Sequence, residues 1–459
     1  MNGVLRDAPV RTRPQVEAQS GAGGLGPAGL GAVGVAEDFA DFAGGFSRRM
    51  LASLRRRDQR VRGEWYVSGL LSVPGRKSMR ALAAVADGGA AEQSLHHFIS
   101  DSSWAWEPVR QDLARHLDRS LRPHAWVVDS MAIPKAGAHS VGVGESFRFD
   151  LGRVVNSQQA HGVYLAGERG AAPVTWGLEL PPEWLEDEAR RRRARIPDGA
   201  TAMSTEAAVA ATAAELTGRA WALRPRPVVL DARPLDVPVL VAELTRRRLP
   251  FVIRVDGGLR LLGTDSGRPR AAERLLQAQQ LADRVKQQSR SVSWLEPERP
   301  GFAGPGFAGP EYAGPEYAGQ VYARPGRAGR PQGAVPRTVL AGGTRVTMPA
   351  GRGLGLTPLA DRRLILAAGW PVPRGRAPEY WLSNLPDVPP AALLRLGRLV
   401  RRVREDAAEI GARVGIRDFE GRSYAGWHRH VTLCSVAHAI LLLSSDRLQD
   451  LDAVKELTA

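Results

Sequence analysis

Three acidic residues are candidates for phosphodiester chemistry: Asp129, Asp231 and Glu405. Each aspartate directly follows a short apolar run with strand propensity, AWVV before Asp129 and PVVL before Asp231. Glu405 comes much later, inside a helical pattern. Carboxylates suit Mg²⁺, and a pair of such ions can activate a nucleophile and stabilise the leaving oxygen. These acids are therefore candidate metal ligands for phosphoryl transfer, with Mn²⁺ as an alternative ion.

The same acids also have ordinary structural interpretations. Aspartate often caps the turn or helix after a strand, which suits Asp129 about as well as catalysis does. Glu405 stands among arginines in LVRRVRED, where a solvated, salt-bridged helix face is the commoner arrangement. The acids alone leave both interpretations open.

The charge balance favours a polyanionic partner. The chain has 63 Lys and Arg against 48 Asp and Glu, a net charge of +15, and almost all of the cations are arginines. Guanidinium groups pair well with phosphate, so nucleic acid is the first expectation. An arginine-rich and alanine-rich composition is equally compatible with a GC-rich genome.

Cysteine content and hydropathy indicate the compartment. Cys434 is the single cysteine, which excludes an internal disulfide and a zinc site built on several cysteines. The first 35 residues lack the order of a signal peptide, and no apolar run reaches the ~18 residues of a membrane helix. We expect a soluble cytoplasmic protein with no membrane partner.

The sequence divides into segments that would position the three acids. A strand, helix, strand pattern over 227–255 indicates an α/β core, and a further helix is expected over 271–288. The expected segments are a disordered arm (1–35), a helical domain (36–122), the first part of the core (123–258), a β-rich insertion (259–385) with a low-complexity repeat (300–332), a helical C-terminal part of the core (386–445) and a tail (446–459).

Five stretches of the sequence together resemble bacterial insertion-sequence transposases of the DDE superfamily endonuclease type. They are YVSGLLSVPGRKS (66–78), LHHFISDSSWAWEPV (95–109), VVDSMAIPKAGAHSVGV (127–143), EYWLSNLP (379–386) and FEGRSYAGWHRHVTL (419–433). The resemblance implies a ribonuclease-H-like core, preceded by the helical domain and interrupted by the β-rich insertion. It also places the family's first two catalytic aspartates on Asp129 and Asp231.

The third acid of the family does not transfer directly. A gapless alignment from GIRDFEGRS backward puts Arg404 on the family's glutamate and Gly411 on its lysine. Glu405 lies one position on, about 100° around the helix axis. Two interpretations follow: either Glu405 has taken over with Arg401 in support, or this is a catalytically decayed copy.

The first motif of the family also differs in this chain. Ser130 stands where the family has a second acid, and Met131 stands where it has threonine. In the same motif, Lys135 and His139 are candidates for contact with DNA phosphate, together with Arg401 from the later helix.

The resemblance implies a DNA transposase that binds the terminal inverted repeats of its element, cuts with Mg²⁺ and joins 3′-hydroxyl ends to a target. Asp129, Asp231 and Glu405 would be the catalytic metal ligands. The alternatives are a decayed, DNA-binding derivative and a metal-dependent nuclease without strand transfer. The expected partner is double-stranded DNA in the bacterial nucleoid, with a homodimer on DNA left open.

Overall fold

The computed structural model describes residues 27–85, 89–148, 153–263, 275–296, 335–349, 363–372 and 377–458. The expected repeat at 300–332 and the first 26 residues of the expected arm lie outside these ranges. Helices and strands are interspersed through the described part, so the chain has the mixed α/β fold that the sequence predicts. None of the described helices has the length and apolar character needed to cross a bilayer.

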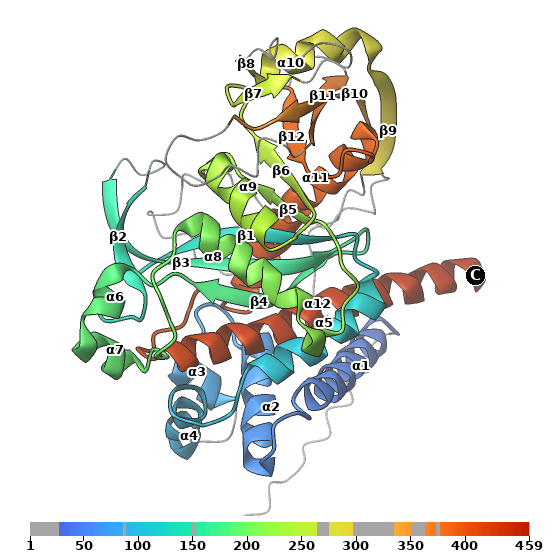
Figure 1. Ribbon diagram of the computed structural model, residues 1–459. Helices are drawn as coiled ribbons and strands as arrows, with labels where there is room; N and C mark the ends of the chain where they lie inside the picture. The colour runs from blue at the N-terminus through green and yellow to red at the C-terminus, as the bar shows by residue number, and fades with distance from the viewer. Residues whose placement is uncertain are drawn as a thin grey trace, which may run out of the picture.

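The centre of the fold is a mixed sheet whose inner strands run in the order β4-β3-β1-β5-β6 (Figure 1). β1 is antiparallel to β3 and parallel to β5, and β5 is parallel to β6. Apolar, β-branched runs form the buried strands, as both faces of this part of the sheet are covered by helices. The bounds are β1 Ala125–Pro134, β2 Val143–Arg148, β3 Arg153–Ala166, β4 Ala171–Leu178, β5 Val228–Asp231 and β6 Phe251–Val255.

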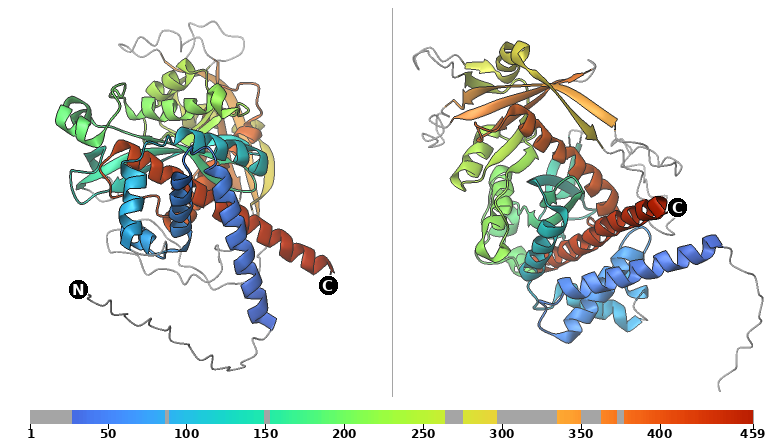
Figure 2. Two further views of the ribbon diagram at one scale, coloured as in Figure 1. Left: turned by 90° about the horizontal axis from the view of Figure 1, so that it is seen from below. Right: turned by 90° about the vertical axis from the view of Figure 1, so that its right-hand side faces the viewer.

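The sheet continues from β6 into a second group of strands in the order β12-β11-β10-β7-β8, with β9 paired to β10. These pairings are antiparallel. Figure 2 shows the group at the end of the molecule farthest from the N-terminal helices. The bounds are β7 Arg260–Gly263, β8 Leu275–Gln277, β9 Arg290–Glu296, β10 Val335–Thr347, β11 Leu364–Val372 and β12 Glu379–Ser383.

The N-terminal helices pack together on the side of the sheet where the long helix α12 runs (Figure 1). The apolar side of the first helix faces the core, where Phe46 and Met50 are buried. The bounds are α1 Pro27–Met50, α2 Arg57–Ser72, α3 Met79–Ala84, α4 Gly89–Ser100 and α5 Glu107–Leu121.

In Figure 1, α8 and α9 lie in front of the sheet and α11 lies behind it, whereas α6 and α7 lie at the edge near β2. Small residues allow close contact: a Cβ at Gly177 of β4 would lie 2.3 Å from Thr212 Oγ1 in α8, and one at Gly397 of α11 would lie 2.5 Å from the Trp381 ring in β12. The bounds are α6 Pro182–Glu186, α7 Glu188–Ala194, α8 Thr205–Ala214, α9 Val237–Arg246, α10 Ala278–Val285, α11 Pro390–Asp406 and α12 Tyr424–Thr458, with short 3₁₀ turns η1 Glu215–Thr217, η2 Arg219–Trp221 and η4 Lys286–Gln288 and a π-helical turn η6 Ala407–Gly411.

Three expected element boundaries are wrong. Helix α1 begins at Pro27, inside the expected arm, and α12 continues to Thr458 through most of the expected tail. Within the helix expected over 271–288, residues 275–277 instead form strand β8, because they pair with β7. Tertiary pairing overrides local helix propensity there, and a capping box at Gln277 starts α10.

A buried cation connects α5, β4 and α12. Arg110 of α5 is 2% exposed, and its guanidinium donates hydrogen bonds to the hydroxyls of Thr432 in α12 (2.8 Å) and Thr175 in β4 (3.2 Å). The Thr175 hydroxyl in turn donates to Glu215 (2.6 Å). Burial lowers the pKa of Arg110 to about 10, so the group is still charged at neutral pH. The N-terminal helices are thereby attached to the sheet through a charged network.

We expect Arg110→Ala to lower the free energy of unfolding by about 3 to 5 kcal/mol, because it leaves buried hydroxyls and Glu215 without their cation. Arg115→Ala on the same helix is the matched control. Arg115 is partly exposed and pairs with Asp112, so its loss should cost less than about 1 kcal/mol. Urea denaturation at neutral pH measures both values, and equal losses would contradict the structural role of Arg110.

Candidate active site

The two aspartates lie on neighbouring parallel strands, just beyond the point where the strands separate. β1 pairs with β5 only at Trp126 and Val127, and Asp129 follows two residues later. Asp231 is the last residue of β5. The expectation that a strand ends at Asp129 is wrong, since β1 continues to Pro134 along β3. The sequence nonetheless predicted correctly that both aspartates follow buried strand segments.

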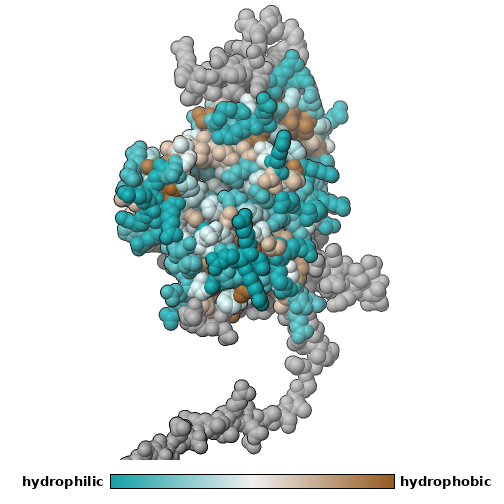
Figure 3. Space-filling view, turned by 60° about the horizontal axis from the view of Figure 1, so that its bottom comes forward, coloured by the Kyte–Doolittle hydropathy of each residue, from teal (hydrophilic) through white to brown (hydrophobic). Residues whose placement is uncertain are grey.

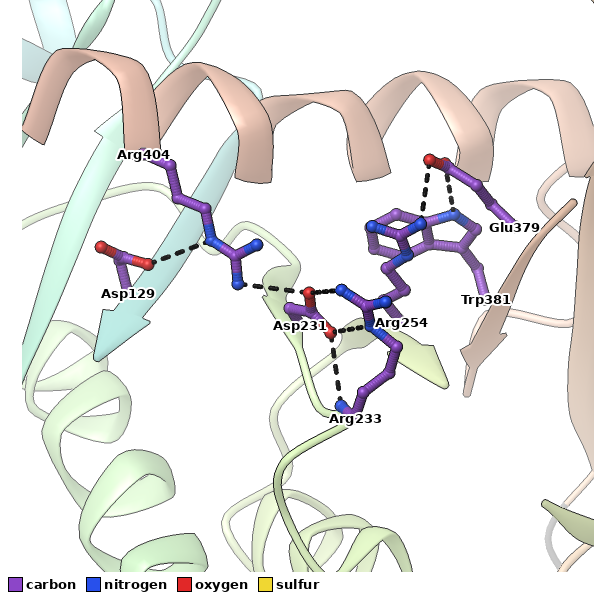
Figure 4. Close-up of polar contacts among 7 residues, drawn as sticks. All are labelled: Asp129, Asp231, Arg233, Arg254, Glu379, Trp381 and Arg404. Atoms are coloured by element: carbon purple, nitrogen blue, oxygen red, sulfur yellow. Dashed lines mark hydrogen bonds and ion pairs between the residues drawn. The ribbon is translucent and has the colours of Figure 1, made fainter. Parts of the chain in front are cut away.

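Arg404 of α11 connects the two carboxylates (Figure 4). Its Nε lies 3.6 Å from Asp129 Oδ1, and its Nη2 donates a hydrogen bond of 3.2 Å to Asp231 Oδ2. α11 crosses β1 and β5, which directs this side chain toward both strands. The residue of α11 that reaches the aspartates is therefore a cation.

A second arginine binds Asp231 from its own loop. Arg233 donates two parallel hydrogen bonds to the Asp231 carboxylate, from Nε (2.8 Å) and Nη2 (2.7 Å), and its backbone N–H donates a third (3.3 Å). The Asp231 side chain is only 3% exposed. Such paired guanidinium contacts are strong and fix the carboxylate orientation. The sequence analysis missed Arg233, although the signal was an arginine two residues after a strand-end aspartate.

The two carboxylates differ in their electrostatics. Burial raises the pKa of Asp129 above its usual range, and the charges of Arg404 and Arg417 offset this only in part. Burial also acts to raise the pKa of Asp231, but the hydrogen bonds and charge of Arg233, with the charge of Arg404, outweigh it and lower that pKa. Asp231 is thus the firmly ionised member of the pair.

Glu405 points away from the aspartates. Its side chain is 63% exposed and forms an ion pair with Arg401 on the same helix (3.4 Å). The next residue, Asp406, is buried, and its carboxylate accepts a hydrogen bond from the backbone N–H of Ala171 (2.9 Å). The structure therefore brings together Asp129 and Asp231, with Arg404 between them, and leaves Glu405 at the surface.

Figure 4 also shows Glu379, which lies on the side of Arg233 away from Asp129. Glu379 of β12 pairs with Arg254 of β6 (3.1 Å), and Trp381 Nε1 donates to its other oxygen (3.4 Å). The Arg254 contact joins β6 to β12, its direct neighbour in the sheet, and the Trp381 contact lies within β12. Glu379 is thus held in a cross-strand pair rather than at the aspartates.

Ser130, at the position of the family's second acid, is on the opposite face of β1 from Asp129, because side chains alternate along a strand. Its hydroxyl lies 2.7 Å from Nδ1 of His161, the residue paired with it in β3. His161 Nε2 lies 2.6 Å from Glu179 Oε1. This polar chain does not reach the two aspartates.

The three residues expected to contact DNA have separate surroundings. Lys135 donates a hydrogen bond from Nζ to the Phe419 carbonyl (2.6 Å), and burial lowers its pKa to about 8. His139 is exposed and lines a surface hollow. Arg401 pairs with Glu405. The structure thus leaves His139 accessible from solution and gives Lys135 a structural contact.

The carboxylates do not form a metal site in this arrangement. Among the described residues, no group of three or more histidine, cysteine, aspartate or glutamate side chains could hold an ion. Oxygens of both aspartates are engaged by guanidinium groups, and the α11 position between them is Arg404. A two-metal site needs oxygen ligands shared between close cations, so this donor set does not fit one.

Comparison with known proteins identifies one family. The sequence model described as DDE superfamily endonuclease matches residues 49–300, a stretch that includes both aspartates and ends before α11. No curated protein matches the chain. Because the match spans more than half of the 459 residues, the chain belongs to the DDE superfamily endonucleases, a family of transposase-type nucleases.

Proposed function

We propose that this protein binds DNA as a transposase-derived protein without cutting it. The observation that carries the proposal is the guanidinium of Arg404 between Asp129 and Asp231. Family membership suggests phosphoryl transfer on nucleic acids, and nucleases of this class generally use divalent metals. With an arginine where a third carboxylate is needed, the chain retains the DNA-acting scaffold and lacks a complete site.

The strand order supports a ribonuclease-H-like core in this proposal. Three antiparallel strands, β4, β3 and β1, are followed across the sheet by the parallel strands β5 and β6. The family match ends within the region that we propose as a β-rich insertion (259–385). The helical domain (36–122) would recognise DNA ends, and the segment 386–445 would complete the core.

Electrostatics supports the loss of cutting. Arg404 and Arg233 supply two positive charges against the two negative charges of the aspartates, so little net charge remains to attract a metal ion. A divalent cation entering there would have to displace hydrogen-bonded guanidinium groups and would be repelled by their charge. Binding of the two metal ions that cutting requires would be less favourable still.

The partner in this proposal is double-stranded DNA, first of all the terminal inverted repeats of the parent element. A net charge of +15 favours a DNA backbone and speeds association. The protein would work in the bacterial cytoplasm on the nucleoid, and a homodimer would let it hold two ends.

A second candidate is the complete transposase, with Asp129, Asp231 and Glu405 as ligands of Mg²⁺ or Mn²⁺. It is favoured by one observation, that Asp129 and Asp231 are both present although a protein that only binds DNA has no need of them. Arg404 is also half-exposed, so its side chain has room to turn. Glu405 would then have to rotate from the surface into the site.

Arg404→Glu tests the proposal by supplying the missing carboxylate. We expect the wild-type protein to show no Mg²⁺-dependent or Mn²⁺-dependent nicking of a plasmid that carries the DNA flanking its gene. Arg404→Glu should bind Mn²⁺ detectably in calorimetry and gain melting temperature when the ion is added, because three acids without Arg404 repel one another.

Glu405→Gln is the matched control for that experiment. Under the proposal it changes neither metal binding nor nicking, because Glu405 only pairs with Arg401 at the surface. If the wild-type protein nicks DNA and Glu405→Gln abolishes the nicking, the complete transposase is correct and the proposal fails.

We also expect Asp231 to act mainly in stability. Asp231→Asn should lower the free energy of unfolding by about 2 to 4 kcal/mol at pH 7, because Arg233 loses its buried partner. Folding lowers the pKa of Asp231. The contribution of its carboxylate to the free energy of unfolding is therefore complete above the unfolded pKa of about 3.9, and it is lost as the pH falls through the lower pKa of the folded state. Denaturation curves of both proteins at pH 7, 4 and 3 should converge in acid. A constant difference down to pH 3 would contradict this assignment.

A further inference from the structure

A surface hollow outside the aspartate site is lined by arginines from two separate segments and by His139 from a third. Its floor and walls comprise Ala138 and His139 after β1, Trp184 of α6, Arg190, Arg193 and Ala194 of α7, and Arg422 before α12. It opens to solvent, and the roughly 270 Å³ of empty space at this place includes open solvent, so the hollow is a shallow surface feature. We call it the α7 hollow.

The arginines of α7 divide into two pairs. Arg190 and Arg193 are three residues apart, so they lie on one helix face and both line the hollow. Arg191 donates to the Pro197 carbonyl (2.8 Å), and Arg192 pairs with Glu188 (3.5 Å). The helix thus directs only part of its charge into the hollow.

The charge of the α7 hollow is only partly compensated. Arg190 stacks over the Trp184 ring at 5.6 Å and forms a long ion pair with Asp187 (3.6 Å). Within the described residues, no carboxylate pairs with Arg193 or Arg422, and both side chains belong to exposed residues. Two guanidinium groups from different segments therefore face a common space with no anion between them.

The walls of the hollow are held in place by buried contacts. Trp184 is 4% exposed, and its Nε1 donates to the Val143 carbonyl (2.7 Å). Lys135 donates to the Phe419 carbonyl (2.6 Å), which ties the loop of His139 to the segment of Arg422. In Figure 3 the left-hand edge of the molecule, on the side where α6 and α7 lie in Figure 1, is strongly hydrophilic. The cations thus stand on an ordered, polar surface.

We propose that the α7 hollow binds a backbone phosphate of DNA, an inference that rests on the proposed function. Guanidinium groups offer paired donors that match phosphate oxygens, and His139 supplies a further donor. A contact of this kind fixes the position of the protein on the duplex and reads no sequence. The residues that line the hollow are not those that contact Asp129 and Asp231. DNA binding there therefore does not require a working metal site.

The double variant Arg193→Gln/Arg422→Gln tests whether the hollow binds phosphate. The measurement is its affinity for a 30-base-pair DNA duplex of random sequence between 50 and 300 mM salt. We expect about a tenfold loss of affinity at low salt. The slope of log affinity against log salt should also fall by about 1, because one phosphate contact is lost. Both side chains are exposed, so the melting temperature should not change.

Arg191→Gln/Arg192→Gln is the matched control, since it removes the same charge from the same surface but leaves the hollow intact. We expect its salt slope to equal that of the wild-type protein. Equal losses in the two double variants would mean a general charge effect and would overturn the hollow while leaving DNA binding in place. A wild-type protein that does not bind the duplex at all would instead refute the proposed function.

Discussion

Two carboxylates on adjacent parallel strands repel one another, and in this protein the guanidinium of Arg404 lies between them. Arg233 adds a second cation on Asp231, and the result is a nearly neutral cluster at a partly buried position. A metal site on the same strands needs the opposite balance, an excess of negative charge that cations can relieve. The charge of one α11 residue therefore decides what kind of site this edge of the sheet presents.

The position of Arg404 depends on how α11 is held. Gly397 lets the helix lie directly on the Trp381 ring, and Asp406 fixes its last turn by accepting from the Ala171 backbone. Both contacts set the rotation of the helix about its axis. In that rotation Arg404 faces the strands and Glu405 faces solvent. Exchanging their roles would require the helix to turn by about 100° and to give up the buried Asp406 contact.

The rest of the fold carries the surfaces on which the proposed DNA binding would depend. Arg110 attaches the N-terminal helices to β4 and α12 through buried hydrogen bonds, so these helices and the sheet form a single scaffold. The α7 hollow adds Arg193 and Arg422, for which no carboxylate partner is found in the described part of the chain, at a surface outside the aspartate cluster. Under the proposed function, DNA affinity and cutting would depend on different residues, so a protein of this family could keep the first without the second.

The sequence by itself determined the mixed α/β class, the two strand-associated aspartates and the basic character, because apolar periodicity and charge are local properties. It also revealed Arg404 in the position of the missing glutamate. Only the tertiary structure decided that Arg404 reaches both carboxylates, that Glu405 is exposed, and that residues 275–277 form a strand. The α7 hollow likewise combines residues from positions 138 to 422. Helix rotation, strand partners and the meeting of distant loops are set by packing, which sequence spacing does not specify.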